Sequence, residues 1–347
     1  MAVVHYPAVD RVDRPAVSVC IANYNGEQML ADCIDSILAQ ADASSIEIIV
    51  HDDASIDASV ALLQSRYPQV ELLASDSNVG FCVSNNRMVA VARGEFVLLL
   101  NNDAALFPDA LATLREAARA NPSAILTLPQ FDWASGDLVD RGCLLDPFYN
   151  PVPNLDPSQR DVAYVIGACL WVPRALWNEL GGFPEWMGSI AEDIYLCGLA
   201  RLRGGSVRVL PDSGYRHRQG ATFGGNRAGA DGLRTSVKRR RLSERNKTRA
   251  LFVLTPGIVV WPLLAAHLVA LAIEGLALCA LRRDMRLWRE VYAPTIATPF
   301  REARMLRTLR RNVQATGRVS FRVWFSAVDW RLRKIALLAR HGVPEVY

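Results

Sequence analysis

The sequence predicts an α/β fold in which helices flank a mostly parallel sheet. Between residues 16 and 110, short apolar runs alternate with amphipathic stretches of about 10 to 15 residues, the pattern of repeated strand–helix–strand units. Most of these apolar runs stop at Asn, Asp or Ser, which favour turns. Because ligands gather beyond the carboxyl ends of parallel strands, these polar residues are candidates for a binding site.

The expected strands are short, mainly apolar runs, which suit strands buried on both faces. They are residues 16–22, 46–50, 70–74 and 96–100. The expected helices carry apolar residues at helical spacing, as Leu30, Cys33 and Ile37 do. They are residues 26–40, 55–67, 84–94, 109–122, 174–183 and 191–205, and a Pro-rich loop is expected at 147–157.

Charge divides the chain into two parts. Residues 1–230 hold 16 Lys and Arg against 27 Asp and Glu, whereas the rest holds 23 against 8, within a total of +4. The seven cysteines show no Cys-x-x-Cys pair and no zinc-ligand spacing, which indicates a reducing compartment and no disulfide framework. The first 17 residues lack an apolar core, so we expect no signal peptide and a cytoplasmic location for most of the chain.

Residues 251–281 are strongly apolar and carry one formal charge, Glu274, so they are long enough to span a bilayer. Pro256 and Pro262 interrupt the run, and both flanks are basic, which opposes moving either flank across a membrane. We therefore expect a membrane-embedded or re-entrant segment. A pair of buried core helices in a soluble domain is the alternative.

Residues 282–347 contain basic amphipathic helices in which Arg alternates with apolar residues such as Trp324 and Trp330. Helices of this composition lie at the headgroup level of anionic membranes. A solvated face that packs on the rest of the protein is the alternative. No nucleic-acid partner is expected, because no recognised nucleic-acid-binding module accompanies the charge.

Four polar sites could carry chemistry, and each also has an ordinary structural explanation. Asp103 ends an Asn-Asn-Asp sequence after the fourth strand and could hold a divalent cation or cap a turn. Asp52 could bind a nucleotide or cap a helix. Glu192 and Asp193 open a helix, where the helix dipole favours carboxylates. His217 lies among arginines and glycines and could meet a diphosphate or its metal.

Five segments place these residues in a fixed order along the chain. They are VSVCIANYNG, IIVHDDASIDAS, NVGFCVSNNRMVAVARGEFVLLLNNDA, GACLWVPRALWNELGGF and AEDIYLCGLARLRGGSVRVLPDSGYRHRQG. Together they resemble the family 2 glycosyltransferases of the GT-A fold, in particular the bacterial rhamnosyltransferase-like branch. The resemblance covers roughly residues 16–250.

The resemblance implies a role for each candidate residue. Asp103 matches the retained ligand of an Asp-x-Asp motif that binds Mg²⁺ or Mn²⁺, and His217 matches a residue that helps hold metal and diphosphate. Asp193 of the Glu192-Asp193 motif matches the general base of an enzyme that inverts the anomeric carbon. The residues implied in nucleotide-sugar binding are Ala22, Tyr24, Asp52, Asn78, Asn86, Arg87 and Asn102.

The sequence departs from the family pattern at several positions. Ala22 replaces a Pro, Asp53 replaces an Asn, and Asn101 replaces the first Asp of the metal motif. The Asn101 amide is neutral and is a weaker metal ligand than the carboxylate it replaces, so we expect weaker metal binding. Ile194 and Tyr195 follow Asp193 where many relatives have acidic or polar residues, which points to an unusual acceptor.

On this resemblance the chain divides into four regions. The first 15 residues form an N-terminal extension, and residues 16–250 form a GT-A catalytic domain. Its halves are a nucleotide-binding part, 16–110, and an acceptor part, 111–250. The apolar segment at 251–281 and the basic interfacial helices at 282–347 complete the chain.

We therefore expect transfer of a sugar, with rhamnose a candidate, from a nucleotide sugar to a polyprenyl diphosphate-linked glycan. The expected place is the cytoplasmic face of the inner membrane, in surface-polysaccharide assembly. A catalytically silent sugar-nucleotide-binding or membrane scaffold protein is one alternative, motivated by Asn101. A nucleotidyltransferase is another, because it also uses a Gly-rich and acidic nucleotide-binding half.

Overall fold

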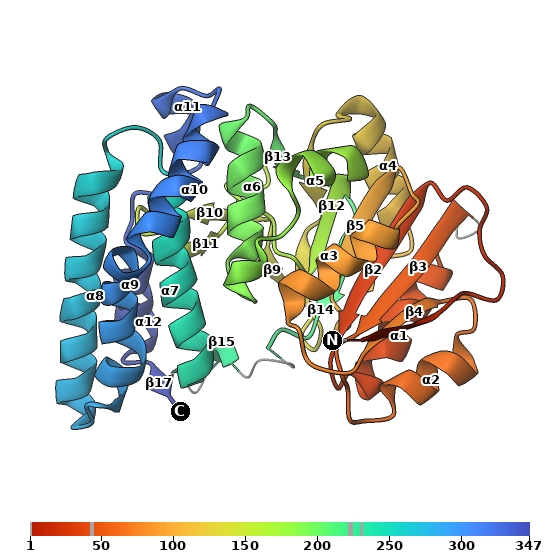
Figure 1. The fold of residues 1–347 in the computed structure, drawn as a ribbon, viewed down its shortest axis with the longest axis horizontal. Coiled ribbons are helices and arrows are strands. Elements are labelled where there is room, and N and C mark those ends of the chain that lie inside the picture. Colours follow the sequence, from red (N-terminus) through yellow and green to blue (C-terminus); the bar gives the residue numbers. More distant parts are fainter. Residues whose placement is uncertain (1, 42–44, 221–224, 230–231) are drawn as a thin grey trace. The chain divides into compact units, whose positions relative to one another are not determined.

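The computed structural model describes residues 2–41, 45–220, 225–229 and 232–347 (Figure 1). The chain divides into two compact units, each assembled from separate stretches of sequence. The sheet unit consists of residues 1–143, 153–189 and 205–218, and the helical unit consists of residues 144–152, 190–204 and 219–347. The domain boundaries expected at residues 15, 250 and 281 stay predictions.

The sheet unit is built on an eight-stranded sheet with the order β1-β4-β3-β2-β5-β12-β7-β13. Its centre is parallel, β1 and β12 run antiparallel to their neighbours, and β13 is parallel to β7. The sheet and its flanking helices confirm the predicted α/β fold class. The strands are β1 (Val3–Tyr6), β2 (Val17–Asn23), β3 (Ile46–Asp52), β4 (Glu71–Ser75), β5 (Phe96–Leu100), β7 (Ile125–Thr127), β12 (Cys169–Pro173) and β13 (Val207–Val209).

The central strands are buried along almost their whole length because both of their faces are covered. All residues of β3 are buried, which a strand with one solvated face would not show. One covering helix, α3, packs against β2 and β3 and crosses them in Figure 1. The helical elements of the sheet unit are α1 (Glu27–Leu38), α2 (Ser59–Arg66), α3 (Phe81–Val91), α4 (Ala110–Ala120), α5 (Arg174–Leu180) and a 3-10 turn (Glu185–Met187).

Helix α3 begins at Phe81, three residues before the expected start at Ser84. Gly80 precedes it with φ of 88°, a left-handed conformation that favours glycine. The Asp53 carboxylate accepts hydrogen bonds from the amides of Val79 at 2.6 Å and Gly80 at 2.9 Å. Asp53 thus fixes the turn that starts the helix, a long-range contact that periodicity does not reveal.

A second, smaller sheet in the same unit has the order β6-β14-β8-β9. It consists of β6 (Ala104–Leu106), β8 (Gln130–Asp132), β9 (Leu138–Asp140) and β14 (Tyr215–His217). β6 directly follows the Asn-Asn-Asp sequence, and β14 ends at His217. This pairing therefore brings two distant parts of the sequence to one place. The chain also forms β10 (Cys143–Leu145) and β11 (Pro151–Pro153).

The helical unit packs around α7, which contacts α6, α8, α9 and α10. α7 is rich in charge, yet Glu244 and Lys247 are buried on it and pair with each other at 3.2 Å. Lys334 also reaches Glu244, at 2.8 Å, so the buried charges are compensated. The elements are α6 (Glu192–Leu202), α7 (Val237–Leu254), α8 (Val260–Arg282), a π-helical turn (Trp288–Tyr292), α9 (Ala293–Arg301), α10 (Ala303–Ala315), α11 (Phe321–Phe325), α12 (Arg333–His341), β15 (Gly225–Gly229), β16 (Gly232–Thr235) and β17 (Glu345–Val346).

The apolar segment expected at 251–281 contains one break. Residues 251–254 end α7, the chain turns around Pro256, and α8 then continues without interruption to Arg282. Pro262 does not break α8 because it lies in the first helical turn, where a missing amide hydrogen costs no helical bond. By length and composition α8 could cross a membrane, and a third of its most apolar window is buried (33%).

Candidate active site

The Asp103 carboxylate and the His217 imidazole form the centre of the candidate site in the sheet unit. β6 and β14 pair so that Ala104, the residue after Asp103, lies opposite His217. The Asp103 Oδ1 and His217 Nε2 atoms are 3.0 Å apart, and both residues are buried. The Asn101 Nδ2 atom lies 3.5 Å from the same imidazole nitrogen. The structure therefore joins two of the four sites proposed from the sequence.

Gln130 determines which imidazole nitrogen of His217 carries a proton. The Gln130 Oε1 atom accepts a hydrogen bond from the Tyr215 hydroxyl at 2.8 Å and lies 3.1 Å from His217 Nδ1. Because a carbonyl oxygen can only accept, Nδ1 donates to Gln130, and Nε2 is the nitrogen that faces Asp103. A carboxylate oxygen and this nitrogen lie 3.0 Å apart stably only with a proton or a metal cation between them.

This pair fits part of the ligand set of a divalent metal. Two ligands at right angles, each about 2.1 Å from Mg²⁺, are about 3.0 Å apart. The Asp103 Oδ1 and His217 Nε2 atoms have this separation, 3.0 Å. Within the described ranges no three His, Cys, Asp or Glu side chains cluster as a complete site. The remaining ligands would therefore be substrate oxygens or water.

A chain of side-chain hydrogen bonds crosses the carboxyl ends of β5, β2 and β3. Asn102 Nδ2 donates to Asn23 Oδ1 over 2.8 Å, and Asn23 Nδ2 donates to Asp52 Oδ2 over 2.8 Å. Ser55 donates to the Asp52 carboxylate through its amide and its hydroxyl. Gly26 permits this approach, since a Cβ there would lie 2.2 Å from Asn23 and Asn102. These groups form a buried, hydrogen-bonded floor beside Asp103.

The residues expected to bind the nucleotide sugar differ in their exposure and in whether other protein groups already bind their polar atoms. Tyr24 is 40% exposed just beyond β2, whereas Ala22 within β2 is half-buried. Asp52 is buried in the floor, with its carboxylate bound by protein donors. Asn78 is exposed, and its side chain donates to the Asp53 carbonyl at 3.3 Å. Of these residues, Tyr24 and Asn78 are therefore the ones exposed to a ligand.

Asn86 and Arg87 on α3 hold other protein segments. Asn86 accepts a hydrogen bond from the Phe183 amide and donates one to the Phe183 carbonyl, both at 2.9 Å. Arg87 donates to the Ser75 hydroxyl at 2.7 Å and lies 3.3 Å from His51 Nε2. Both residues are half-buried and shape the region around the end of β4. Their expected roles in donor binding stay predictions.

The structure adds contacts to the site that the sequence pattern did not reveal. The Arg218 amide donates to the Asp103 carbonyl at 3.0 Å. Its guanidinium lies 3.9 Å from the centre of the Trp133 ring and forms an ion pair with Asp32. Together with Asn23 and Gln130, these side chains support the predicted residues. One signal available in the sequence was that Asn23 ends its strand as Asp52 does.

Glu192 and Asp193 occupy the first turn of α6 in the helical unit. Glu192 is 6% exposed, and its Oε2 atom has no hydrogen-bond partner in the described part of the chain. Burial, reinforced by the neighbouring Asp193 carboxylate, raises the pKa of Glu192 to about 8. Glu192 therefore keeps its proton near neutral pH. Asp193 is half-buried and accepts a hydrogen bond from the Ile194 amide at 2.7 Å.

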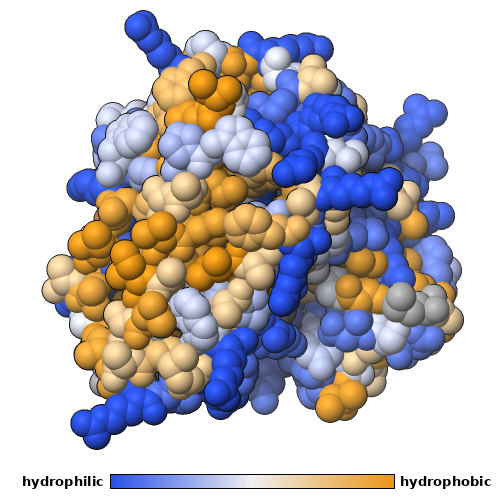
Figure 2. Space-filling model, turned by 60° about the vertical axis from the view of Figure 1, so that its left-hand side comes forward, coloured by the Kyte–Doolittle hydropathy of each residue, from blue (hydrophilic) through white to orange (hydrophobic). Residues whose placement is uncertain are grey.

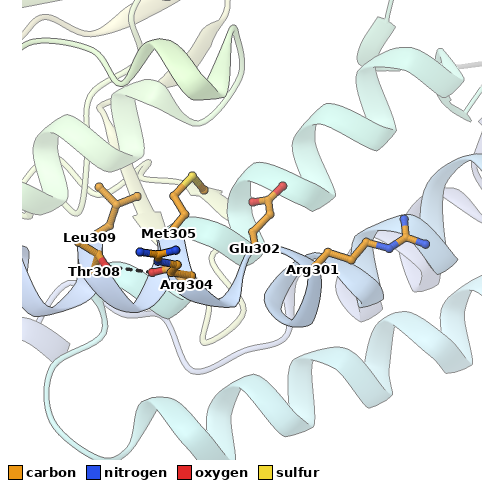
Figure 3. A pocket seen from close by; sticks show the side chains of 6 residues that line it. All are labelled: Arg301, Glu302, Arg304, Met305, Thr308 and Leu309. Atoms are coloured by element: carbon orange, nitrogen blue, oxygen red, sulfur yellow. Dashed lines mark hydrogen bonds between the residues drawn. The ribbon is translucent and has the colours of Figure 1, made fainter.

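The structure thus brings Asp52, Asn102, Asp103 and His217 to one edge of the sheet unit. Asp193 belongs to the helical unit, so its convergence with them on one cavity stays a prediction. A shallow pocket of about 590 Å³ lies elsewhere in the helical unit, on α9 and α10 (Figure 3). None of the predicted site residues lines this pocket, whose walls are Arg301, Glu302, Arg304, Met305, Thr308 and Leu309.

The sheet and its polar edge define the chain's first unit as a GT-A-type domain, and comparison with solved structures supports this class. GalNAc-T7, solved with UDP, GalNAc and Mn²⁺, superposes with a TM-score of 0.65 at 13% identity, covering 96% of this chain and 59% of that one. The mannosyltransferase PcManGT of Pyrobaculum calidifontis, solved with GDP-Man and Mn²⁺, gives 0.51 at 18% identity, covering 87% and 86%. At these identities the likeness shows the fold.

Sequence comparison finds a family match over part of the chain. Residues 18–177 match the model of glycosyl transferase family 2. The succinoglycan biosynthesis protein ExoO of Rhizobium meliloti is 30% identical over 220 residues, 60% of this chain and 62% of that protein. An N-acetylglucosaminyl-diphospho-decaprenol L-rhamnosyltransferase of Mycobacterium tuberculosis is 27% identical over 190 residues, 46% of this chain and 62% of that protein. The chain thus matches less than two thirds of either relative, and the resemblance predicted from the motifs is confirmed over residues 18–177.

Proposed function

We propose that the protein is an inverting glycosyltransferase that moves a sugar from a nucleotide sugar to a glycan carried on a polyprenyl diphosphate in surface-polysaccharide assembly. The observation that carries the proposal is the Asp103–His217 pair beside the strand-end floor of a family 2 domain. The names of the two relatives, one a decaprenol-linked rhamnosyltransferase and one a succinoglycan biosynthesis protein, support the lipid-linked acceptor. They also make rhamnose the first sugar to test.

Asp103 and His217 are the residues that would hold a divalent ion, and Gln130 orients the imidazole for that role. When bound, Mg²⁺ or Mn²⁺ neutralises charge on the departing diphosphate. Mn²⁺ in the GalNAc-T7 and PcManGT structures supports this assignment. Asn101 supplies a neutral amide in place of a carboxylate, so Asp103 is the one charged ligand of its tripeptide.

The floor formed by Asn102, Asn23 and Asp52 prepares the donor site before a ligand binds. Each side chain is fixed by a hydrogen bond to the next, so little ordering is left for the binding step. Tyr24, exposed beside the floor, would stack on the nucleotide base. Ala22, Asn78, Asn86 and Arg87 would complete the walls of this donor site.

Asp193 is the proposed general base. It takes the proton from an acceptor hydroxyl while that oxygen forms a bond to the anomeric carbon and the bond to the nucleoside diphosphate breaks. Attack from the face opposite the leaving group inverts the anomeric carbon. Glu192 keeps its own proton at neutral pH, so it adds no second negative charge beside Asp193.

One exposed face of α8 in the helical unit supports membrane association as part of the proposal. The exposed side chains of α8 are apolar from its first turn to its last, as Trp261, Val269 and Leu281 show. Figure 2 brings this side of the molecule forward and shows a broad apolar area. Exposed arginines follow at the end of α8, at positions 282, 283 and 286. An apolar face next to basic residues suits the cytoplasmic leaflet of the inner membrane, which carries anionic lipids.

Incubation of the purified protein with labelled dTDP-, UDP- or GDP-sugars and a polyprenyl diphosphate-linked saccharide tests the proposal. We expect transfer of label to lipid with inverted configuration, and loss of transfer when EDTA removes divalent metal. Binding of the nucleotide sugar without turnover would instead support a scaffold protein. In a parallel incubation with a nucleoside triphosphate and a labelled sugar 1-phosphate, formation of a sugar nucleotide with release of pyrophosphate would support a nucleotidyltransferase.

A further inference from the structure

The turn that leads into α6 is strained. Ile190 and Ala191 both have positive φ, 70° and 72°, a left-handed conformation that side chains with a Cβ disfavour. Ile190 is β-branched, which makes it an especially uncommon residue for this conformation. Glu192 and Asp193 follow directly, so the direction of this turn sets where their carboxyl groups lie. Strain of this kind persists only where surrounding groups hold it, and it concentrates at functional sites.

The group that holds the turn is Asn246 on α7. Asn246 is fully buried, and its Nδ2 atom donates to the Ile190 carbonyl over 2.9 Å. Its Oδ1 atom accepts from Arg249 Nη1 at 3.1 Å and from Arg245 Nε at 3.4 Å. The amide of Asn246 therefore cannot rotate without losing contacts at both ends.

The Arg249 guanidinium is itself fixed by Glu302, at the start of α10. Arg249 Nε lies 2.8 Å from Glu302 Oε2, and Nη2 lies 2.5 Å from Oε1, a bidentate pair. Figure 3 shows the Glu302 side chain pointing away from that of Arg301, its neighbour in the chain. A connected set of side chains thus runs from Glu302 through Arg249 and Asn246 on α7 to Ile190, in the turn that leads into α6.

We propose that Asn246 is a positioning residue for the glycosyl transfer. It clamps the left-handed Ile190–Ala191 turn so that Asp193 is held where the acceptor hydroxyl arrives, and the Arg249–Glu302 pair orients the clamp. The inference rests on the proposed role of Asp193 as base. It assigns to the C-terminal helices a part in the reaction that is separate from membrane binding.

Asn246→Leu tests the clamp, because leucine has nearly the same volume and no polar atoms. We expect kcat to fall by about 10- to 100-fold, the loss typical of a catalytic group displaced by about 1 Å. Affinity for the nucleotide sugar should stay within twofold, because the donor residues lie in the sheet unit. Thr248→Val is the matched control, since Thr248 is fully buried two residues away on α7 and hydrogen-bonds His267 at 2.8 Å.

Thr248→Val should lower the melting temperature about as much as Asn246→Leu does, and it should keep the wild-type kcat. Ile190→Gly in the Asn246→Leu background supplies a rescue, because glycine adopts the left-handed conformation without a clamp. We expect this double variant to regain at least part of the lost kcat. Unchanged kcat in Asn246→Leu, equal losses in Thr248→Val, or no recovery in the double variant would each overturn the proposal. Failure of the proposed function itself would look different, since the wild-type protein would then transfer no sugar.

Discussion

Replacement of Glu192 by Gln should remove a pH-dependent loss of stability. Burial raises the pKa of Glu192 from its ordinary value of 4.5 to about 8. Between these values the folded protein keeps a proton that the unfolded chain has lost, so stability falls as pH rises. The loss amounts to at most about 1.4 kcal/mol for each pH unit, or about 5 kcal/mol across the whole window. Glutamine has nearly the same shape and does not titrate.

Urea unfolding of both proteins at pH 5, 6, 7 and 8.5 measures the effect. The difference in unfolding free energy, variant minus wild type, should grow by several kcal/mol from pH 5 to 8.5. Glu290→Gln is the control, because the Glu290 side chain is 41% exposed and pairs with Arg286 on the surface. It should follow the wild-type curve to within about 0.5 kcal/mol. Parallel curves for Glu192→Gln and wild type would show that Glu192 is ionised in the folded protein and refute the reasoning.

Three further predictions concern the reaction and the membrane. Asp193→Asn should lower kcat by about 10² to 10⁴-fold with donor affinity unchanged, because it removes the proton acceptor and little volume; substantial turnover by this variant excludes Asp193 as the base. Asp103→Ala should weaken nucleotide-sugar binding about tenfold or more in Mn²⁺ and very little in EDTA, measured by calorimetry, and equal weakening in both would contradict a metal role. Ile273→Lys with Leu276→Lys, at positions 65% and 52% exposed, should reduce sedimentation with anionic vesicles while changing stability by less than about 1 kcal/mol. Undiminished sedimentation would rule out the α8 face as the membrane contact.

The sequence pattern predicts the centre of the sheet well, because buried parallel strands are short, mainly apolar runs. It does not show that β12 enters antiparallel between β5 and β7, since a buried strand has the same composition in either direction. Asp103 and His217 could be proposed from their places after strands. Their contact at 3.0 Å depends on the β6–β14 pairing, which local periodicity does not contain.

The sequence pattern predicts the helical unit less well than it predicts the sheet. The stretch before residue 251 has the composition of a basic, solvated flank, yet it forms α7, which carries buried Glu244, Asn246 and Arg249. Their partners lie far along the chain, as Glu302 does from Arg249. A charged residue becomes a core residue only when such partners fold onto it, and composition alone does not reveal them.

The helical unit takes α6 from the middle of the chain and the rest of its helices from the end, and this order has a consequence during synthesis. α6 buries nearly all of its residues, and its packing partner α7 ends at Leu254. At roughly 5 to 20 residues per second, α6 waits several seconds on the ribosome without that partner. Lys334, which neutralises Glu244, emerges later still. A nascent chain stalled before α12 should therefore be a substrate for chaperones, even though every residue of the sheet unit has already been made.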